Sequence, residues 1–181
     1  MMYHLTMFNV KMTKDEVRVC TMLGVERWLM KFDSTDRPNY DAGKKDGRLE
    51  PELLANIRTI IAEWAVAKAT NKVYSLPWYP NELHPHRKHL PDVGGNMEVR
   101  TVRTQDAVAI WKKDAGKAIV ACRVTDSEYF RDVEVYGWIM ADDVIGKSEF
   151  EDSYIGGWRF PLTSMTPFPE PTHLNTASPW S

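Results

Sequence analysis

The sequence predicts an α+β or α/β protein in which two N-terminal helices precede a mostly antiparallel or mixed central sheet of about five strands. The hydrophobic periodicity changes from helical to alternating near Asp92. A length of 181 residues suits one domain with a sizeable core and is short for two. We therefore expect one domain over residues 1–160. Residues 161–181 are rich in proline, and we expect an extended tail that packs on the body or on a partner.

Two segments carry helical patterns. Thr13 and Glu16 have the spacing of a capping box and predict the start of a helix over 13–32. A stronger pattern predicts a second helix over 50–70, which Asn71 ends. The apolar face of this second helix is formed by Leu53, Leu54, Ile57, Ile60, Ile61, Trp64 and Ala65.

The strand-like segments all follow the second helix. A turn at Gly94-Gly95-Asn96 precedes the first of them. The expected strands cover residues 97–102, 107–111, 118–124 and 132–140, with Val93 on the other side of the glycine turn. A short helix is expected over 141–146.

Composition indicates an intracellular protein. No apolar run approaches the roughly 18 residues that cross a bilayer, and the N-terminus lacks the pattern of a secretory signal. Cys20 and Cys122 are far apart and outside any CxxC motif, which favours a reducing compartment. We expect a cytoplasmic location without membrane association.

The net charge of -2 lacks the basic excess of a non-specific nucleic-acid binder. Basic residues nevertheless gather in one stretch around the site described next. Those predicted to contact nucleic acid are Arg87, Lys88, Arg103 and Lys112. Scattered solvated charges are an equally good interpretation of composition alone.

Chemistry is expected where the strands begin. Glu98 and Arg100 are two positions apart on a strand and share a face. Asp92 lies across the glycine turn, so a hairpin would return its carboxylate towards Glu98. Two converging carboxylates suit Mg²⁺ or Mn²⁺, and a nearby cation would stabilise negative charge at a phosphodiester.

These residues resemble the signature of the PD-(D/E)XK nuclease superfamily. Pro91-Asp92, a short connection and Glu98-Val99-Arg100 match its motif, and residues 62–68 resemble the helix that brings an additional acid to such sites. Tyr136-Gly137-Trp138-Ile139 resembles small phage-encoded members of the superfamily. The likeness runs from about Glu16 to the tail.

The resemblance implies a restriction-endonuclease-like core and a magnesium-dependent endo- or exonuclease that acts on nucleic acid, with DNA the expected substrate, in the cytoplasm of a phage host. It implies that Asp92 and Glu98 hold the metal and that Glu63 assists as a third ligand. Arg100 stands where the superfamily has lysine. Since arginine stays protonated, the alternative is a degenerate nuclease fold that binds DNA or a host protein without cleavage. A homodimer also stays open.

Each of these residues also has a simpler interpretation. Asp92 could be a turn carboxylate that bonds its own backbone. Glu63 could be an exposed helix charge, and Glu98 with Arg100 a same-face ion pair. The histidines at positions 84, 86 and 89 suit a solvated loop better than zinc, because no cysteine accompanies them.

Overall fold

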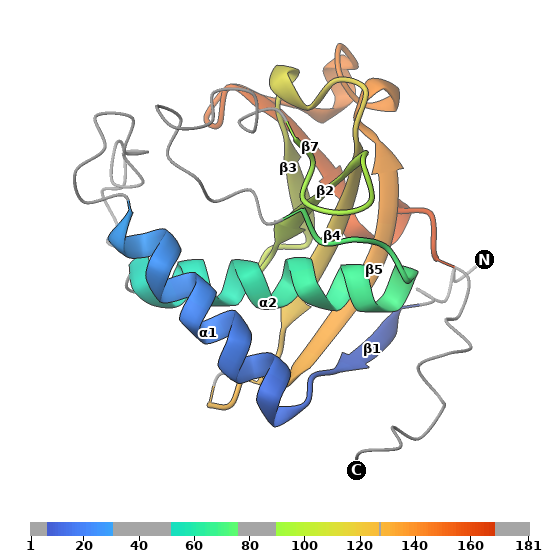
Figure 1. Ribbon diagram of the computed structural model, residues 1–181. Helices are drawn as coiled ribbons and strands as arrows, with labels where there is room; N and C mark the ends of the chain where they lie inside the picture. The colour runs from blue at the N-terminus through green and yellow to red at the C-terminus, as the bar shows by residue number, and fades with distance from the viewer. Residues whose placement is uncertain (1–6, 31–51, 76–89, 127, 169–181) are drawn as a thin grey trace.

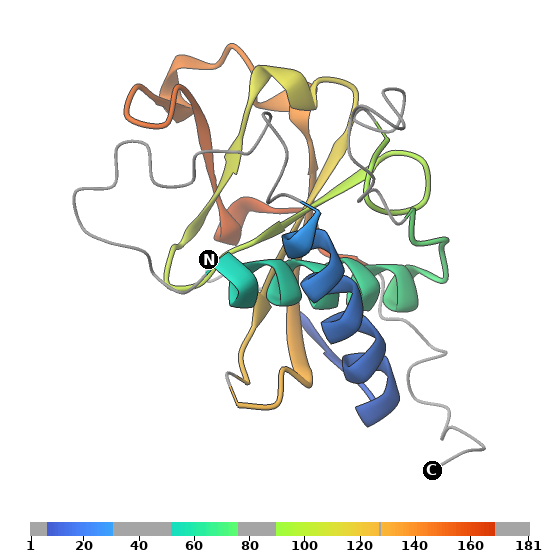
Figure 2. The same ribbon diagram turned by 60° about the vertical axis from the view of Figure 1, so that its left-hand side comes forward.

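The computed structural model describes residues 7–30, 52–75, 90–126 and 128–168. Its two helices are α1 (Lys14–Leu29) and α2 (Glu52–Thr70). Figures 1 and 2 show both helices on one face of the larger sheet. Helix α2 packs directly on that sheet, and α1 packs on α2. In the described residues no helix has the length and apolar character needed to span a membrane.

Two sheets form the rest of the fold. The larger has the strand order β1-β5-β4-β2, in which only β2 and β4 are parallel. Its strands are β1 (Phe8–Lys11), β2 (Met97–Thr101), β4 (Ala118–Val124) and β5 (Asp132–Met140). The smaller, antiparallel sheet has the order β3-β7-β6. It consists of β3 (Ala107–Ile110), β6 (Glu151–Asp152) and β7 (Gly157–Pro161).

The architecture confirms an α+β fold with two helices and mixed pairing, but the single sheet of about five strands is wrong. Strand β3 leaves the larger sheet and pairs with β7, far along the chain. Strand β1 precedes the first helix and was not predicted, because its four residues carry little periodicity. The helix expected over 141–146 is only a 3₁₀ turn, Ala141–Asp143.

The predicted start of α1 and the predicted end of α2 are confirmed, whereas α1 ends at Leu29, before the predicted residue 32. The Thr13 N–H donates to the Glu16 carboxylate at 2.7 Å, and the Glu16 N–H donates to the Thr13 hydroxyl at 3.2 Å. Both halves of the capping box are therefore present. Asn71, directly after α2, has a φ of 53°, the left-handed conformation that ends a helix.

The larger sheet separates two apolar cores, and this separation decides where the side chains of β2 point. Val99 and its neighbour on β4, Val120, join the core beneath the helices. Ile119 and Ala121 on β4 join the core between the two sheets. Their partners on β2 are Glu98 and Arg100. Alternation along a strand therefore directs these two charged side chains away from the helices.

The last described segment returns to the body. Thr166 exchanges two backbone hydrogen bonds with Trp138, each of 2.9 Å. Phe168 packs edge-on against Phe8 of β1. The rest of the predicted proline-rich tail, residues 169–181, lies outside the described residues.

The close contact between α1 and α2 predicts that Gly24→Ala destabilises the fold. A Cβ at this position would lie 2.7 Å from the Ile57 Cα. Overpacking of this kind costs about 1–3 kcal/mol, which urea denaturation would measure. Val19→Ala is the matched control, because Val19 on α1 is 41% exposed. It should change the free energy of unfolding by no more than about 0.5 kcal/mol. Equal effects of the two substitutions would contradict the packing argument.

Candidate active site

A tight turn brings Asp92 back alongside β2. Val93 and Met97 exchange backbone hydrogen bonds of 3.0 and 3.1 Å across it. Gly94 and Gly95 have φ values of 62° and 89°, which glycine adopts without strain. The Asp92 carboxylate then accepts a 2.8 Å hydrogen bond from the Val99 N–H. Its position is therefore fixed by the strand that also carries Glu98.

Asp92 is buried among other carboxylates. Only 8% of the residue is exposed, and this burial raises the pKa of its carboxyl well above the ordinary value. The negative charges of Glu63 and Glu98 raise this pKa further, while the Val99 N–H and Arg27 oppose the rise. The predicted acids thus interact electrostatically in the folded protein.

Glu98 lies between two cations. Its Oε1 accepts from Arg100 at 2.9 Å, and its Oε2 accepts from Lys117 at 2.7 Å. Lys117 immediately precedes β4, whose parallel pairing with β2 brings it beside Glu98. Arg100 also donates to Asp114 at 2.8 Å. Asp114 is fully buried and accepts the Trp111 N–H at 2.9 Å.

The ion pair of Glu98 with Arg100, one of the simpler interpretations, is therefore present. It belongs to a larger network, and both side chains are largely buried. The Nε of Arg100 is also buried, and it has no hydrogen-bond partner within the described ranges.

Glu63 lies on α2 and interacts electrostatically with Asp92. It is 1% exposed, so its interpretation as an exposed helix charge is wrong. Its Oε1 accepts from Arg27 at 3.2 Å, and its Oε2 accepts the Tyr74 hydroxyl at 2.6 Å. Burial and the Glu63 charge raise the pKa of Tyr74, so this hydroxyl keeps its proton at neutral pH.

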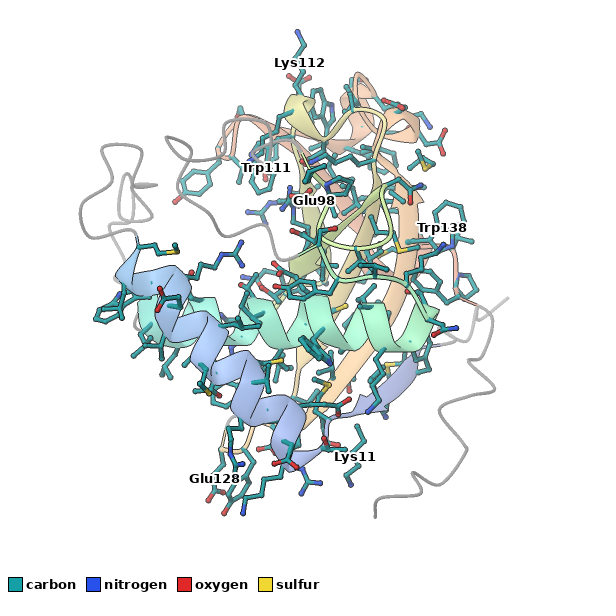
Figure 3. All side chains as sticks on the ribbon, viewed as in Figure 1. Lys11, Glu98, Trp111, Lys112, Glu128 and Trp138 are labelled. Atoms are coloured by element: carbon teal, nitrogen blue, oxygen red, sulfur yellow. The ribbon has the colours of Figure 1, made fainter. Side chains whose placement is uncertain are left out.

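The four residues predicted to contact nucleic acid differ in whether they are described and in how exposed they are. Arg87 and Lys88 lie outside the described residues. Arg103 follows β2 and is half-buried. Lys112 is exposed at the start of the 3₁₀ turn η2 (Lys112–Asp114). Figure 3 shows Lys112 projecting from the same half of the molecule as Glu98 and Trp111.

A divalent cation at this site would have only one or two ligands from the protein. Across residues 7–30, 52–75, 90–126 and 128–168, no group of three or more His, Cys, Asp or Glu is arranged to hold a metal. Mg²⁺, however, commonly uses one or two carboxylates and completes its shell with water and phosphate. Asp92 and Glu98 are the two carboxylates that would supply such ligands, and a cation there would offset the negative charge that, together with burial, raises the pKa of Asp92.

Four partners in this site were not predicted from the sequence: Arg27, Tyr74, Asp114 and Lys117. Asp114 had a local signal, since a carboxylate three residues after Trp111 can accept its N–H. Lys117 had none, because its contact depends on the pairing of β2 with β4.

No protein-family model, curated protein or solved structure matches this chain. The function must therefore be inferred from the geometry of the site and from the motif.

The raised pKa of Asp92 predicts a pH dependence of stability. As pH rises above the ordinary aspartate pKa, the unfolded chain releases this proton while the folded protein retains it. The wild type should therefore lose stability relative to Asp92→Asn between about pH 4 and the raised pKa. Urea denaturation of both proteins across this range measures the difference.

Asp126 supplies a control of opposite sign. Backbone N–H groups, that of Tyr129 first, lower the pKa of this carboxyl. The wild type should therefore gain stability relative to Asp126→Asn as pH rises through the lowered pKa towards the ordinary one. A pH-independent difference for Asp92→Asn would contradict the raised pKa of this buried carboxyl.

Proposed function

We propose that this protein is a metal-dependent nuclease that hydrolyses phosphodiesters of nucleic acid, with DNA as the expected substrate and Asp92 and Glu98 as ligands of Mg²⁺ or Mn²⁺. The observation that carries the proposal is the hydrogen bond that holds Asp92 on β2, next to Glu98 and its two cations. The similarity of this segment to the PD-(D/E)XK motif supports the same assignment. A restriction-endonuclease-like core is part of the proposal.

The proposed reaction adds water to phosphorus and expels one ester oxygen, which leaves a phosphate monoester and a free hydroxyl. A metal bound at the two carboxylates would polarise the phosphate and lower the pKa of a bound water. Arg100 would stabilise the added negative charge. Its buried Nε–H has no hydrogen-bond partner among the described residues, and it could donate a hydrogen bond to a phosphate oxygen.

Lys117 would supply the ammonium group that the motif lacks because Arg100 stands in place of its usual lysine. It reaches Glu98 from the position directly before the neighbouring strand β4. Lysine carries a compact charge on a flexible stem, whereas Arg100 is held by both Glu98 and Asp114. When a metal binds Glu98, Lys117 would move from this carboxylate to the attacking water or the phosphate.

Glu63 would support the site mainly through its charge. Both of its oxygens already accept hydrogen bonds, from Arg27 and from Tyr74. Direct ligation would require one of these bonds to break. In the arrangement described, the negative charge of Glu63 acts on Asp92 and would strengthen its attraction for a cation.

The second candidate is binding of DNA or a host protein without chemistry. It is favoured by Glu98, whose two oxygens are both occupied by cations of the protein itself. In that case Arg100 and Lys117 replace the metal permanently. Divalent-ion binding and cleavage would then both be absent.

Cleavage is tested by incubating the purified protein with single-stranded and duplex DNA and RNA in Mg²⁺ or Mn²⁺. Asp92→Asn and Glu98→Gln should each reduce the rate by at least about 100-fold, because each removes charge that binds the metal. Glu128→Gln is the matched control, an exposed acid at the opposite end of the molecule (Figure 3). Cleavage that persists in both site variants would indicate a contaminating nuclease.

Metal binding is tested separately through stability. Mn²⁺ at 100 times its dissociation constant should raise the free energy of unfolding by about 2.7 kcal/mol. Glu98→Gln should abolish this gain. Lys117→Met should retain or increase it, because a competitor for Glu98 is removed, yet should slow cleavage. No stabilisation of the wild type by Mn²⁺ or Mg²⁺ would favour the second candidate.

A further inference from the structure

We infer that the protein binds single-stranded nucleic acid on a surface formed by Trp111, Lys112, Lys113 and Tyr154, which we call the aromatic–lysine surface. This inference rests on the proposed nuclease function and names the form of its substrate. The surface joins two segments far apart in the chain: the 3₁₀ turn η2 and the turn between β6 and β7.

Tyr154 is held at the end of a rigid turn. The Asp152 carboxylate accepts the N–H groups of Tyr154 and Ile155, at 2.9 and 3.4 Å. Gly156 completes the turn with a φ of 62°. Tyr154 is nevertheless 81% exposed, the highest exposure among the large hydrophobic residues described. The backbone is therefore fixed while the aromatic ring stays accessible, as a stacking platform requires.

This turn is connected to the candidate active site through Trp111. The indole N–H of Trp111 donates to the Ile155 carbonyl at 3.4 Å. The Arg100 guanidinium lies 5.2 Å from the centre of the Trp111 ring, and Arg100 also binds Glu98. A strand that contacts Tyr154 and Trp111 would therefore lead to the carboxylates.

The charge of the surface suits phosphate. Lys112 and Lys113 are exposed on η2, and the Lys113 ammonium lies 5.7 Å from the Trp111 ring centre. The acid within η2, Asp114, is fully buried and paired with Arg100. In the other turn, Asp152 is paired with Arg159 at 2.7 Å. The two exposed lysines are thus not neutralised by these two acids.

The combination favours a single strand over a duplex. Exposed aromatic rings gain binding energy from the faces of bases, which a single strand presents and a duplex hides in its stack. A duplex reader would instead need an extended basic surface. The net charge of -2 and the small number of exposed lysines here do not provide that.

Fluorescence anisotropy with labelled oligothymidylate in EDTA measures binding without cleavage. Tyr154→Ala should weaken binding about tenfold through loss of one stacked base, and Tyr154→Trp should restore it. The matched control is Tyr129→Ala. Tyr129 lies in the β4–β5 turn and is 61% exposed, so this substitution should leave the affinity for the oligomer unchanged.

An abasic oligomer of equal length separates stacking from charge. Tyr154→Ala should leave its binding unchanged, whereas Lys112→Ala should weaken binding of both oligomers and reduce the salt slope by about 0.7. Equal losses for Tyr154→Ala and Tyr129→Ala, or a duplex bound as tightly as the single strand, would overturn the inference. Metal-dependent cleavage with no dependence on Tyr154 would overturn it while leaving the proposed function intact. Binding that depends on Tyr154, with no cleavage in any metal, would support this surface and refute the nuclease.

Discussion

The hydrogen bond from the Val99 N–H to the Asp92 carboxylate is the constraint on which the candidate site depends. It fixes a buried carboxylate against the backbone of β2. The same strand sends Val99 into the helix-covered core and Glu98 and Arg100 to the opposite face. One short strand therefore determines both the packing beneath it and the position of the charged groups.

The charged network is costly for stability. Four acids, Glu63, Asp92, Glu98 and Asp114, lie among three cations, Arg27, Arg100 and Lys117. Burying such charges costs several kcal/mol per ion, and ion pairing seldom returns more than that amount. An apolar set of similar volume would stabilise the fold at least as well. A buried carboxyl with a raised pKa, such as Asp92, among other buried charges is typical of functional sites, which is why we interpret the network as chemical rather than structural.

Local patterns in the sequence predicted the local features. The capping box at Thr13, the glycine turn before β2 and the alternation of Glu98 with Val99 each involve neighbours in the chain, and all are present. The features that were missed depend on distant pairing. The parallel pairing of β2 with β4 brings in Lys117, and helix packing brings Arg27 to Glu63. No periodicity within either segment encodes such contacts.

The smaller sheet also has a consequence for the order in which the protein can assemble. Strand β3 carries the chain into Trp111, yet its only partner in this sheet, β7, is made about 50 residues later. During translation the helices and much of the larger sheet can form while the segment that orients Arg100 and Asp114 still lacks its supporting strand. The nascent chain would therefore form its helix-covered core before the core between the two sheets, and a chain truncated before β7 would lack the strand that supports the segment around Trp111 and Asp114.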